Sequence, residues 1–212
     1  VQQERTISDA FEQSTSGNTL VDMMELDILV GSGGVLSHAP RRNQAARMLI
    51  DAFLPEGITR LAVDSIFMMP QLGILSTLHS KAAVEVFEKD CLIQLGTCIA
   101  PVGIQKKNTA ILDYTFLFDE KRIEGTLMQG ELKLLKVNSS IVEAKLVPVK
   151  GLDVGGGKGE TLITKVSGGE VGIILDGRGR QPFSLSNQSS MRIKELIRWS
   201  EETNEYPEIK VH

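Results

Sequence analysis

Residues 27–40 read DILVGSGGVLSHAP, and this stretch decides the fold of the chain. The apolar segment 27–31 has the composition of a strand buried in a parallel sheet. The glycines that follow allow a tight turn, because glycine has no Cβ and adopts positive φ freely. Residues 41–54 then place apolar side chains at helical spacing. A strand, a glycine turn and a helix in this order bring bare backbone and helix N–H groups beside a ligand, which suits the oxygens of phosphate or ribose.

The pattern of the 212-residue chain changes near residue 105. Before that point, we expect short helices at 3–13 and 18–25, strands at 27–31 and 61–63, helices at 41–54 and 71–88, and an extended segment at 91–100. Strand–helix–strand order of this kind predicts a parallel unit. Beyond it, we expect β segments at 110–118, 122–127, 131–137, 141–149, 161–166 and 170–175, and then a helix at 191–202.

These patterns predict an α/β part followed by a β-rich part. The α/β part is expected at 1–105. Short strands at regular spacing, separated by Gly, Asn, Asp and Lys, predict a small β-barrel or sandwich module at 106–190. A C-terminal helix and tail follow at 191–212.

Composition excludes several classes of protein. The formal net charge of −4 argues against a nucleic-acid partner. No apolar run is long enough to span a bilayer, and no secretory leader is visible. Cys91 and Cys98 make neither a disulfide framework nor a zinc site, and the three histidines form no metal motif. We therefore expect a cytoplasmic protein with buried thiols and no resident metal. Since the chain begins at Val1, we expect it to be a fragment of a longer protein.

Residues 27–50 resemble the adenosine motif of the actin-like ATPase superfamily, whose domains have a ribonuclease H-like fold. In that superfamily the glycines pass close to the adenosine and its phosphates. The resemblance implies that the chain is the C-terminal half of such a domain and that this turn binds ATP or ADP. The candidate nucleotide-binding residues are Gly31, Ser32, Gly33, Gly34, Ser37 and His38. For His38, a role at the entry of the next helix is the favoured interpretation, because Pro40 suits a first helical turn.

A narrower resemblance covers most of the chain. Residues 30–38, 69–76 and 168–182 are similar to the C-terminal part of the glutamate mutase accessory protein family, called MutL or GlmL. This family is unrelated to the mismatch-repair MutL. Its members accompany adenosylcobalamin-dependent mutases and aminomutases, and the resemblance implies an ATP-driven, chaperone-like reactivating factor that helps to expel damaged cobalamin. The implied partner is such a mutase or aminomutase.

One departure from the superfamily pattern limits the implied activity. The superfamily's first phosphate motif, a strand with an Asp-x-Gly-x-Thr-like loop, has no counterpart before Asp27, and the second phosphate loop is also missing. We therefore expect this chain to hold half of a nucleotide site and no catalytic residue. Mg²⁺ and ATP hydrolysis are expected only in the full-length protein.

Two other functions remain open. In the first, the glycine turn is structural and the chain is a protein-interaction module. In the second, the chain is a metabolic enzyme with a Rossmann-like site. The glycine spacing disfavours this enzyme, because it is Gly-x-Gly-Gly rather than Gly-x-Gly-x-x-Gly. The oligomeric state is left open.

Three lesser motifs have plainer interpretations. Asp64 follows a strand and is interpreted as a turn or cap residue. Residues 155–159, GGGKG, lack the Ser or Thr that a phosphate-binding loop places after its Lys, so a hairpin is expected. Residues 176–180, DGRGR, offer two arginines to an anion or form an ordinary turn, and the turn is favoured.

Overall fold

The computed structural model describes residues 21–103, 105–138, 141–180 and 185–206. The helix expected at 3–13 lies outside these residues. Of the helix expected at 18–25, the described part holds a single 3₁₀ turn, η2 (Met23–Glu25).

A five-stranded sheet forms the centre of the described chain. Its strands are β1 (Ile28–Gly31), β2 (Gly57–Asp64), β3 (Leu92–Ala100), β6 (Leu132–Leu135) and β9 (Gly172–Asp176). Their spatial order is β1-β2-β3-β9-β6. β1 is parallel to β2, as the sequence predicts, and β9 is parallel to β3. β3 is antiparallel to β2, and β6 is antiparallel to β9.

A second sheet of four strands is antiparallel throughout. Its strands are β4 (Ala110–Phe118), β5 (Lys121–Met128), β7 (Val142–Pro148) and β8 (Leu162–Val166), in the order β5-β4-β7-β8. Along β7 the burial alternates from residue to residue, as expected for a strand with one face packed and one face in solvent.

Helices of very different burial accompany the sheets. They are α1 (Gly34–Ser37), α2 (Arg42–Phe53), α3 (Met69–Val86), the π-helical turn η3 (Phe87–Cys91) and α4 (Ser189–Glu202). The apolar face of α2 is buried through Ala45, Leu49 and Ile50. Within the described residues, no helix is both long and apolar enough to cross a membrane.

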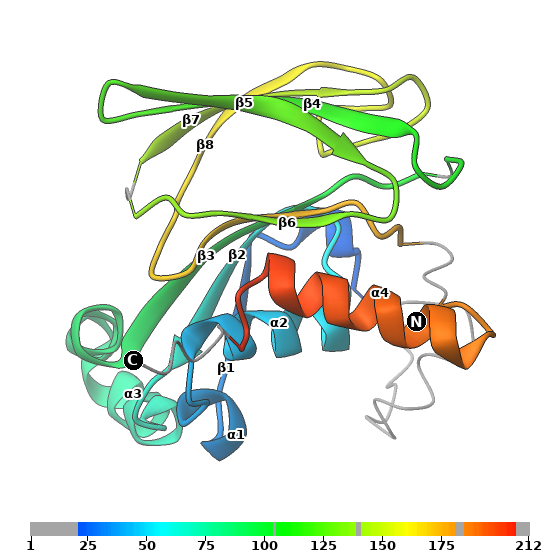
Figure 1. Cartoon of the computed structure of the whole chain (residues 1–212). Coiled ribbons are helices and arrows are strands. Elements are labelled where there is room, and N and C mark those ends of the chain that lie inside the picture. Colours follow the sequence, from blue (N-terminus) through cyan, green and yellow to red (C-terminus); the bar gives the residue numbers. More distant parts are fainter. Residues whose placement is uncertain (1–20, 104, 139–140, 181–184, 207–212) are drawn as a thin grey trace, which may run out of the picture.

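Two cores separate three layers (Figure 1). The four-stranded sheet lies over one face of the five-stranded sheet, and α2 and α4 lie over the other. In the core between the sheets, Phe116 and Leu146 pack with Ile99 and Ile173. In the core under the helices, residues of α2 pack with β2, β3, β9 and Trp199. The described protein is thus mixed α/β, with a β-rich portion and a terminal helix.

Two findings differ from the sequence expectations. β6 and β9 come from the segment expected to be the β-rich module, yet they complete the sheet of the α/β part. The four-stranded sheet therefore packs against that sheet rather than forming a sandwich by itself. The boundaries expected at residues 105 and 190 stay a prediction. On α4, Trp199 is buried, whereas the apolar residues Leu196 and Ile197 are exposed.

The helix expected at 71–88 is α3, and most of its apolar residues are not buried. Within α3 the buried side chains are those of Leu72 and Ala83. Ile74 is 73% exposed and Leu78 is 80% exposed. The topology explains this, because α3 joins two neighbouring antiparallel strands and so does not have to cross the sheet. It lies beyond the end of the sheet, at the lower left of Figure 1.

Candidate functional site

The glycine turn lies at the end of β1, beside the end of the parallel strand β2. Gly31 pairs with Val63, so the turn and Asp64 share one edge of the sheet. Gly33 has φ +105°, a conformation that L side chains rarely adopt. The expected tight turn is thus present. The helix that follows directly is α1, a single turn, and α2 begins only at Arg42, so the longer helix does not present its N-terminus at the glycines.

The three glycines of the turn have different surroundings. A Cβ on Gly31 would lie 2.7 Å from Leu36 Cδ1 and 3.0 Å from Leu49 Cδ2, so this residue faces the core. A Cβ on Gly33 or Gly34 would have no heavy atom within 4 Å. Gly33 and Gly34 therefore leave open space over the backbone, whereas Gly31 allows close packing of α1 and α2 on the strand.

Asp64 holds the turn in place from the neighbouring strand. The Ser32 hydroxyl donates to Asp64 Oδ2 at 3.3 Å, and the Ser37 hydroxyl donates to the Asp64 carbonyl. The backbone N–H groups of Met68 and Met69 donate to the same carboxylate, at 3.1 and 3.0 Å. The expected cap role of Asp64 is confirmed, and its carboxylate joins two connections that each follow a parallel strand.

Hydrogen bonding decides the charge state of Asp64, whose side chain is buried. Burial alone would raise its pKa, because it disfavours the ionised form. The N–H groups of Met69, Met68 and Ile66 and the Ser32 hydroxyl outweigh burial and hold the pKa below its ordinary value of 3.8. The carboxylate is therefore ionised at neutral pH and already engaged by donors.

A hollow of about 340 Å³ adjoins the turn. Its walls come from α1 and the loop after it, from α2 and from the residues after α4. The lining residues are Gly34, Val35, His38, Ala39, Pro40, Gln44, Arg47, Met48, Glu205 and Tyr206. Of the six candidate residues, Gly34 and His38 line this hollow, and His38 is exposed. Ser37, the last residue of α1, is buried, and its hydroxyl faces Asp64 instead of the hollow.

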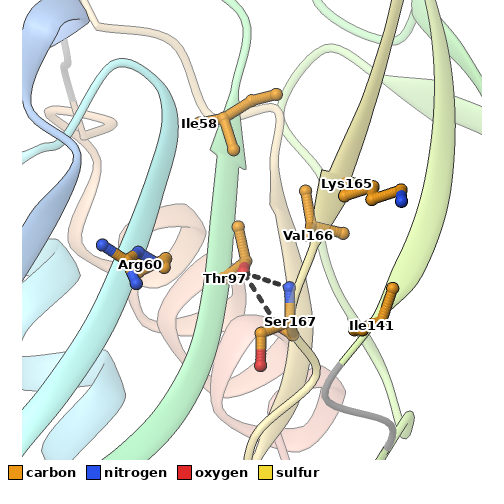
Figure 2. Close-up of a pocket in the computed structure, with 7 residues that line it drawn as sticks. All are labelled: Ile58, Arg60, Thr97, Ile141, Lys165, Val166 and Ser167. Atoms are coloured by element: carbon orange, nitrogen blue, oxygen red, sulfur yellow. Dashed lines mark hydrogen bonds between the residues drawn. The ribbon is translucent and has the colours of Figure 1, made fainter.

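A second hollow, of about 210 Å³, lies where the two sheets diverge (Figure 2). Thr97 fixes its floor, since its hydroxyl donates to the Ser167 carbonyl at 2.7 Å and accepts the Ser167 N–H at 3.2 Å. Figure 2 shows Arg60 and Lys165 on opposite sides of Thr97. The two cations do not converge on one point, so this hollow does not form a focused anion site.

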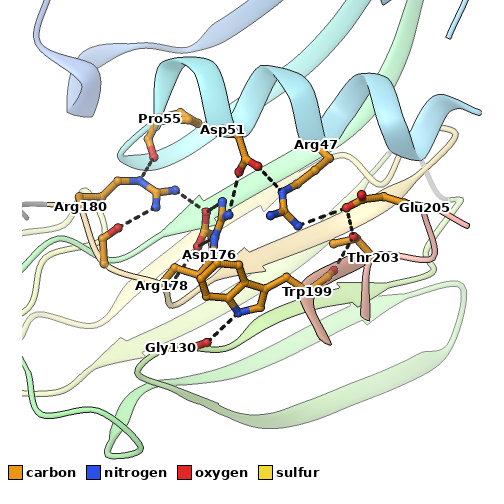
Figure 3. Close-up of polar contacts among 11 residues, drawn as sticks. Arg47, Asp51, Pro55, Gly130, Asp176, Arg178, Arg180, Trp199, Thr203 and Glu205 are labelled. Carbon is orange, nitrogen blue, oxygen red and sulfur yellow. Dashed lines mark hydrogen bonds and ion pairs between the residues drawn. The ribbon is translucent and has the colours of Figure 1, made fainter. Parts of the chain in front are cut away.

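The motif at 176–180 forms a buried ionic cluster that sequence reasoning missed (Figure 3). Arg178 donates to Asp176 through Nε at 2.9 Å and Nη2 at 2.7 Å, and Arg180 Nη2 donates to Asp176 at 2.8 Å. Arg178 also reaches Asp51 of α2 at 2.7 Å. Asp176 is 1% exposed. Its two arginines face a carboxylate inside the protein and not an external anion.

Charge pairing sets the ionisation of this cluster. Burial would raise the pKa of Asp176, but Arg180 and Arg178 hold it far below its ordinary range. Burial would lower the pKa of Arg178, and its bonds to Asp176 and Asp51 raise it instead. Trp199 is stacked among these cations, with the guanidinium carbons of Arg178 and Arg47 at 5.2 and 5.8 Å from its ring. The cluster therefore joins β9, α2 and α4.

The other cysteine and glycine motifs are structural. Cys91 and Cys98 are free and buried, as expected. In the 155–159 segment, Asp153 Oδ1 accepts the N–H groups of Gly155 and Gly157 at 2.8 and 3.0 Å. This segment joins the antiparallel strands β7 and β8, which confirms the hairpin interpretation.

The described geometry defines a class of protein: a mixed α/β protein with a glycine turn beside a hollow at the end of a parallel strand pair. Residues 3–91 match the family described as MutL protein. For that segment, the match confirms the resemblance to the glutamate mutase accessory family MutL or GlmL. It includes the glycine turn, Asp64 and α3, and it ends before the four-stranded sheet begins. No curated protein and no solved structure matches the chain.

Proposed function

We propose that this chain is part of an ATP-dependent reactivating protein for an adenosylcobalamin-dependent mutase or aminomutase, and that it binds ATP or ADP at the glycine turn. The family match supports the accessory role. The observation that carries nucleotide binding is the open space over Gly33 and Gly34, beside a hollow large enough for a small ligand. A strand end with bare backbone allows the close approach that a nucleotide needs.

The donor set fits part of a nucleotide site. Gly33 and Gly34 offer exposed backbone to ribose or phosphate oxygens, whereas the Ser32 hydroxyl donates to Asp64 and helps to hold the turn. Among the described residues, no three His, Cys, Asp or Glu side chains come together to hold a metal ion. In this proposal other parts of the full-length protein hold Mg²⁺, as the resemblance to the actin-like ATPases implies. The chain's own role is to bind and orient the nucleotide, and Asp64 keeps the turn in its binding shape.

A nucleotide at this turn would act on the partner only through differential affinity. If one nucleotide state of the protein binds the mutase better than the other, hydrolysis shifts the population between these states. In this proposal the elements joined by Asp64 carry that shift, because Asp64 ties the turn to the start of α3.

The substitution Gly34→Val tests nucleotide binding. A Cβ at this position meets no heavy atom within 4 Å, so we expect the valine side chain to enter the space assigned to the ligand and to leave the fold intact. We expect ADP affinity, measured by calorimetric titration, to fall at least about tenfold. Gly73→Val is the matched control, since Gly73 of α3 also has nothing within 4 Å. If Gly34→Val bound ADP as well as the parent chain, or if the parent chain did not bind ADP, the proposal that the glycine turn binds a nucleotide would be wrong.

A second candidate function, a protein-interaction module, is favoured by α3. Ile74 and Leu78 lie four residues apart on one side of α3 and are 73% and 80% exposed, and neighbouring exposed apolar side chains of this kind mark interaction sites. The double substitution Ile74→Ser and Leu78→Ser should abolish capture of the mutase and leave ADP affinity unchanged. If Gly34→Val leaves mutase capture intact and ADP does not bind, this second function replaces the first.

A further inference from the structure

The hollow beside the glycine turn has a wall that the sequence motif does not include. α1 and the loop after it supply one side, through Gly34 and His38. The other side comes from Gln44 and Arg47 of α2 and from Glu205 and Tyr206, which follow α4. Residues about 170 positions apart in the sequence therefore meet at one hollow.

Two residues of the segment 203–206, Thr203 and Glu205, are held against α2, and Figure 3 shows Glu205 facing Arg47. Asn43 Nδ2 donates to the Thr203 carbonyl at 2.8 Å. Glu205 Oε1 accepts Arg47 Nη1 at 3.2 Å and the Thr203 hydroxyl at 2.6 Å, and Glu205 Oε2 accepts the Ser200 hydroxyl at 3.2 Å. The Glu205 side chain is 13% exposed. Hydrogen bonds to α2 and α4 therefore fix the position of this segment at the side of the hollow.

The charges of this wall cancel. Arg47 is paired with both Asp51 and Glu205. Because the guanidinium already has two carboxylates, it has little attraction left for a phosphate. The part of the hollow next to α2 therefore suits a neutral group better than an anionic one.

Tyr206 is the aromatic residue at the rim of this wall. It is 74% exposed, although the residue before it is anchored at both carboxylate oxygens. Its hydroxyl has no hydrogen-bond partner among the described residues. An exposed ring next to an anchored residue is a suitable surface for stacking a flat ligand, because little motion has to be lost on binding.

We infer that residues 203–206 form the base-binding wall of the nucleotide site, with the Tyr206 ring stacking on the nucleobase. This inference rests on the proposed function. The glycine turn takes the ribose and phosphates, the neutral hollow takes the base, and Glu205 is a positioning residue that holds Tyr206 at the rim through Arg47.

The test compares ADP with adenosine, which keeps the base and ribose and lacks the phosphates. Both ligands are titrated calorimetrically into the parent chain and its variants. We expect Tyr206→Ala to weaken both ligands about tenfold, the range of one stacked base, and Tyr206→Phe to stay within about twofold of the parent. Ile193→Ala is the control, because it also truncates an exposed apolar side chain and Ile193 lies outside the hollow.

Glu205→Gln tests positioning. We expect it to weaken adenosine and ADP by a similar factor while α4 stays docked. Fluorescence of Trp199, the one tryptophan in the chain, reports whether α4 stays docked in each variant.

The outcomes separate the two proposals. If ADP binds and Tyr206→Ala binds it equally well, or if adenosine does not bind at all, the base-binding wall is wrong and the nucleotide role stands. If neither ADP nor adenosine binds the parent chain, both proposals are wrong. Equal loss of both ligands in Tyr206→Ala, with retention in Tyr206→Phe, supports the inference.

Discussion

The Ser32 hydroxyl lies 3.3 Å from the Asp64 carboxylate, and this hydrogen bond links the glycine turn after β1 to the connection after β2. The two residues are 32 positions apart in the sequence. Parallel pairing of β1 and β2 brings them together, because it places the ends of both strands at one edge of the sheet. The shape of the turn therefore depends on a residue outside the glycine motif.

Replacing Asp64 with Asn should destabilise the protein. The Asn amide has one oxygen to accept what two carboxylate oxygens accept now, and its NH₂ group would face the N–H donors of Met68 or Met69. We expect the free energy of unfolding to fall by about 1–3 kcal/mol. Urea denaturation followed by Trp199 fluorescence measures it. Asp119→Asn, at an exposed turn position, is the control, and an equal effect of both substitutions would contradict this role for Asp64.

The stability of the protein should fall in acid. Asp64 and Asp176 both have a pKa lower in the folded state than the ordinary value of 3.8. Their stabilisation is fully present above the ordinary carboxyl pKa, and it is lost as the pH falls through the folded pKa of each residue. We expect a loss of stability that begins below about pH 4. Urea midpoints measured from pH 7 to pH 3 test this. In Asp64→Asn the midpoint should depend less steeply on pH than in the parent protein.

Much of the α/β order was predictable because local patterns agree with the tertiary fold. The apolar run before the glycines forms β1, and the apolar spacing of 41–54 forms α2, which buries that face. The cap role of Asp64 also follows from its position after a strand. In these segments each residue's local preference and its final environment point the same way.

What could not be predicted depends on contacts distant in sequence. Nothing local in DGRGR shows that Asp176 will be buried with both arginines, since that requires β9 to insert beside β3 and α2 to cover it. The exposure of α3 could not be predicted from the sequence for a similar reason. Its spacing resembles that of a packed helix, and only the antiparallel pairing of β2 with β3 shows that it lies beyond the sheet.

The ionic cluster should be the most sensitive polar group in the protein. Asp176→Ala leaves Arg178 and Arg180 buried without their shared carboxylate, and we expect a loss of about 3–5 kcal/mol in the free energy of unfolding. Glu124→Gln breaks the exposed Arg122–Glu124 pair and should cost no more than about 1 kcal/mol. Urea denaturation of both variants gives the comparison. If both substitutions lowered the free energy of unfolding by a similar, small amount, the buried cluster would contribute little to stability.

Gly31 and Gly34 of the turn should respond differently to alanine: Gly31→Ala should destabilise the protein and Gly34→Ala should not. In Gly31→Ala the new methyl lies too close to Leu36 and Leu49, and we expect a loss of about 1–3 kcal/mol. In Gly34→Ala the methyl enters open space, and the change should stay within about 0.5 kcal/mol. Thermal unfolding of the two variants is the measurement. If Gly34→Ala were the more damaging substitution, the open space above this residue would not exist in solution.

The Cys98 thiol should be unreactive in the folded protein. Burial raises its pKa to about 12, with Asp176 adding to the shift and the two arginines of the cluster opposing it. At pH 8 the thiolate that reacts with a disulfide reagent is therefore scarce, and Cys98 is 1% exposed. In a Cys91→Ser variant, which leaves Cys98 as the single thiol, we expect labelling by an aromatic disulfide reagent only after urea unfolds the chain. Labelling of this variant in native buffer at the rate of a free thiol would instead mean that the core under α2 opens locally, well below the free energy of global unfolding.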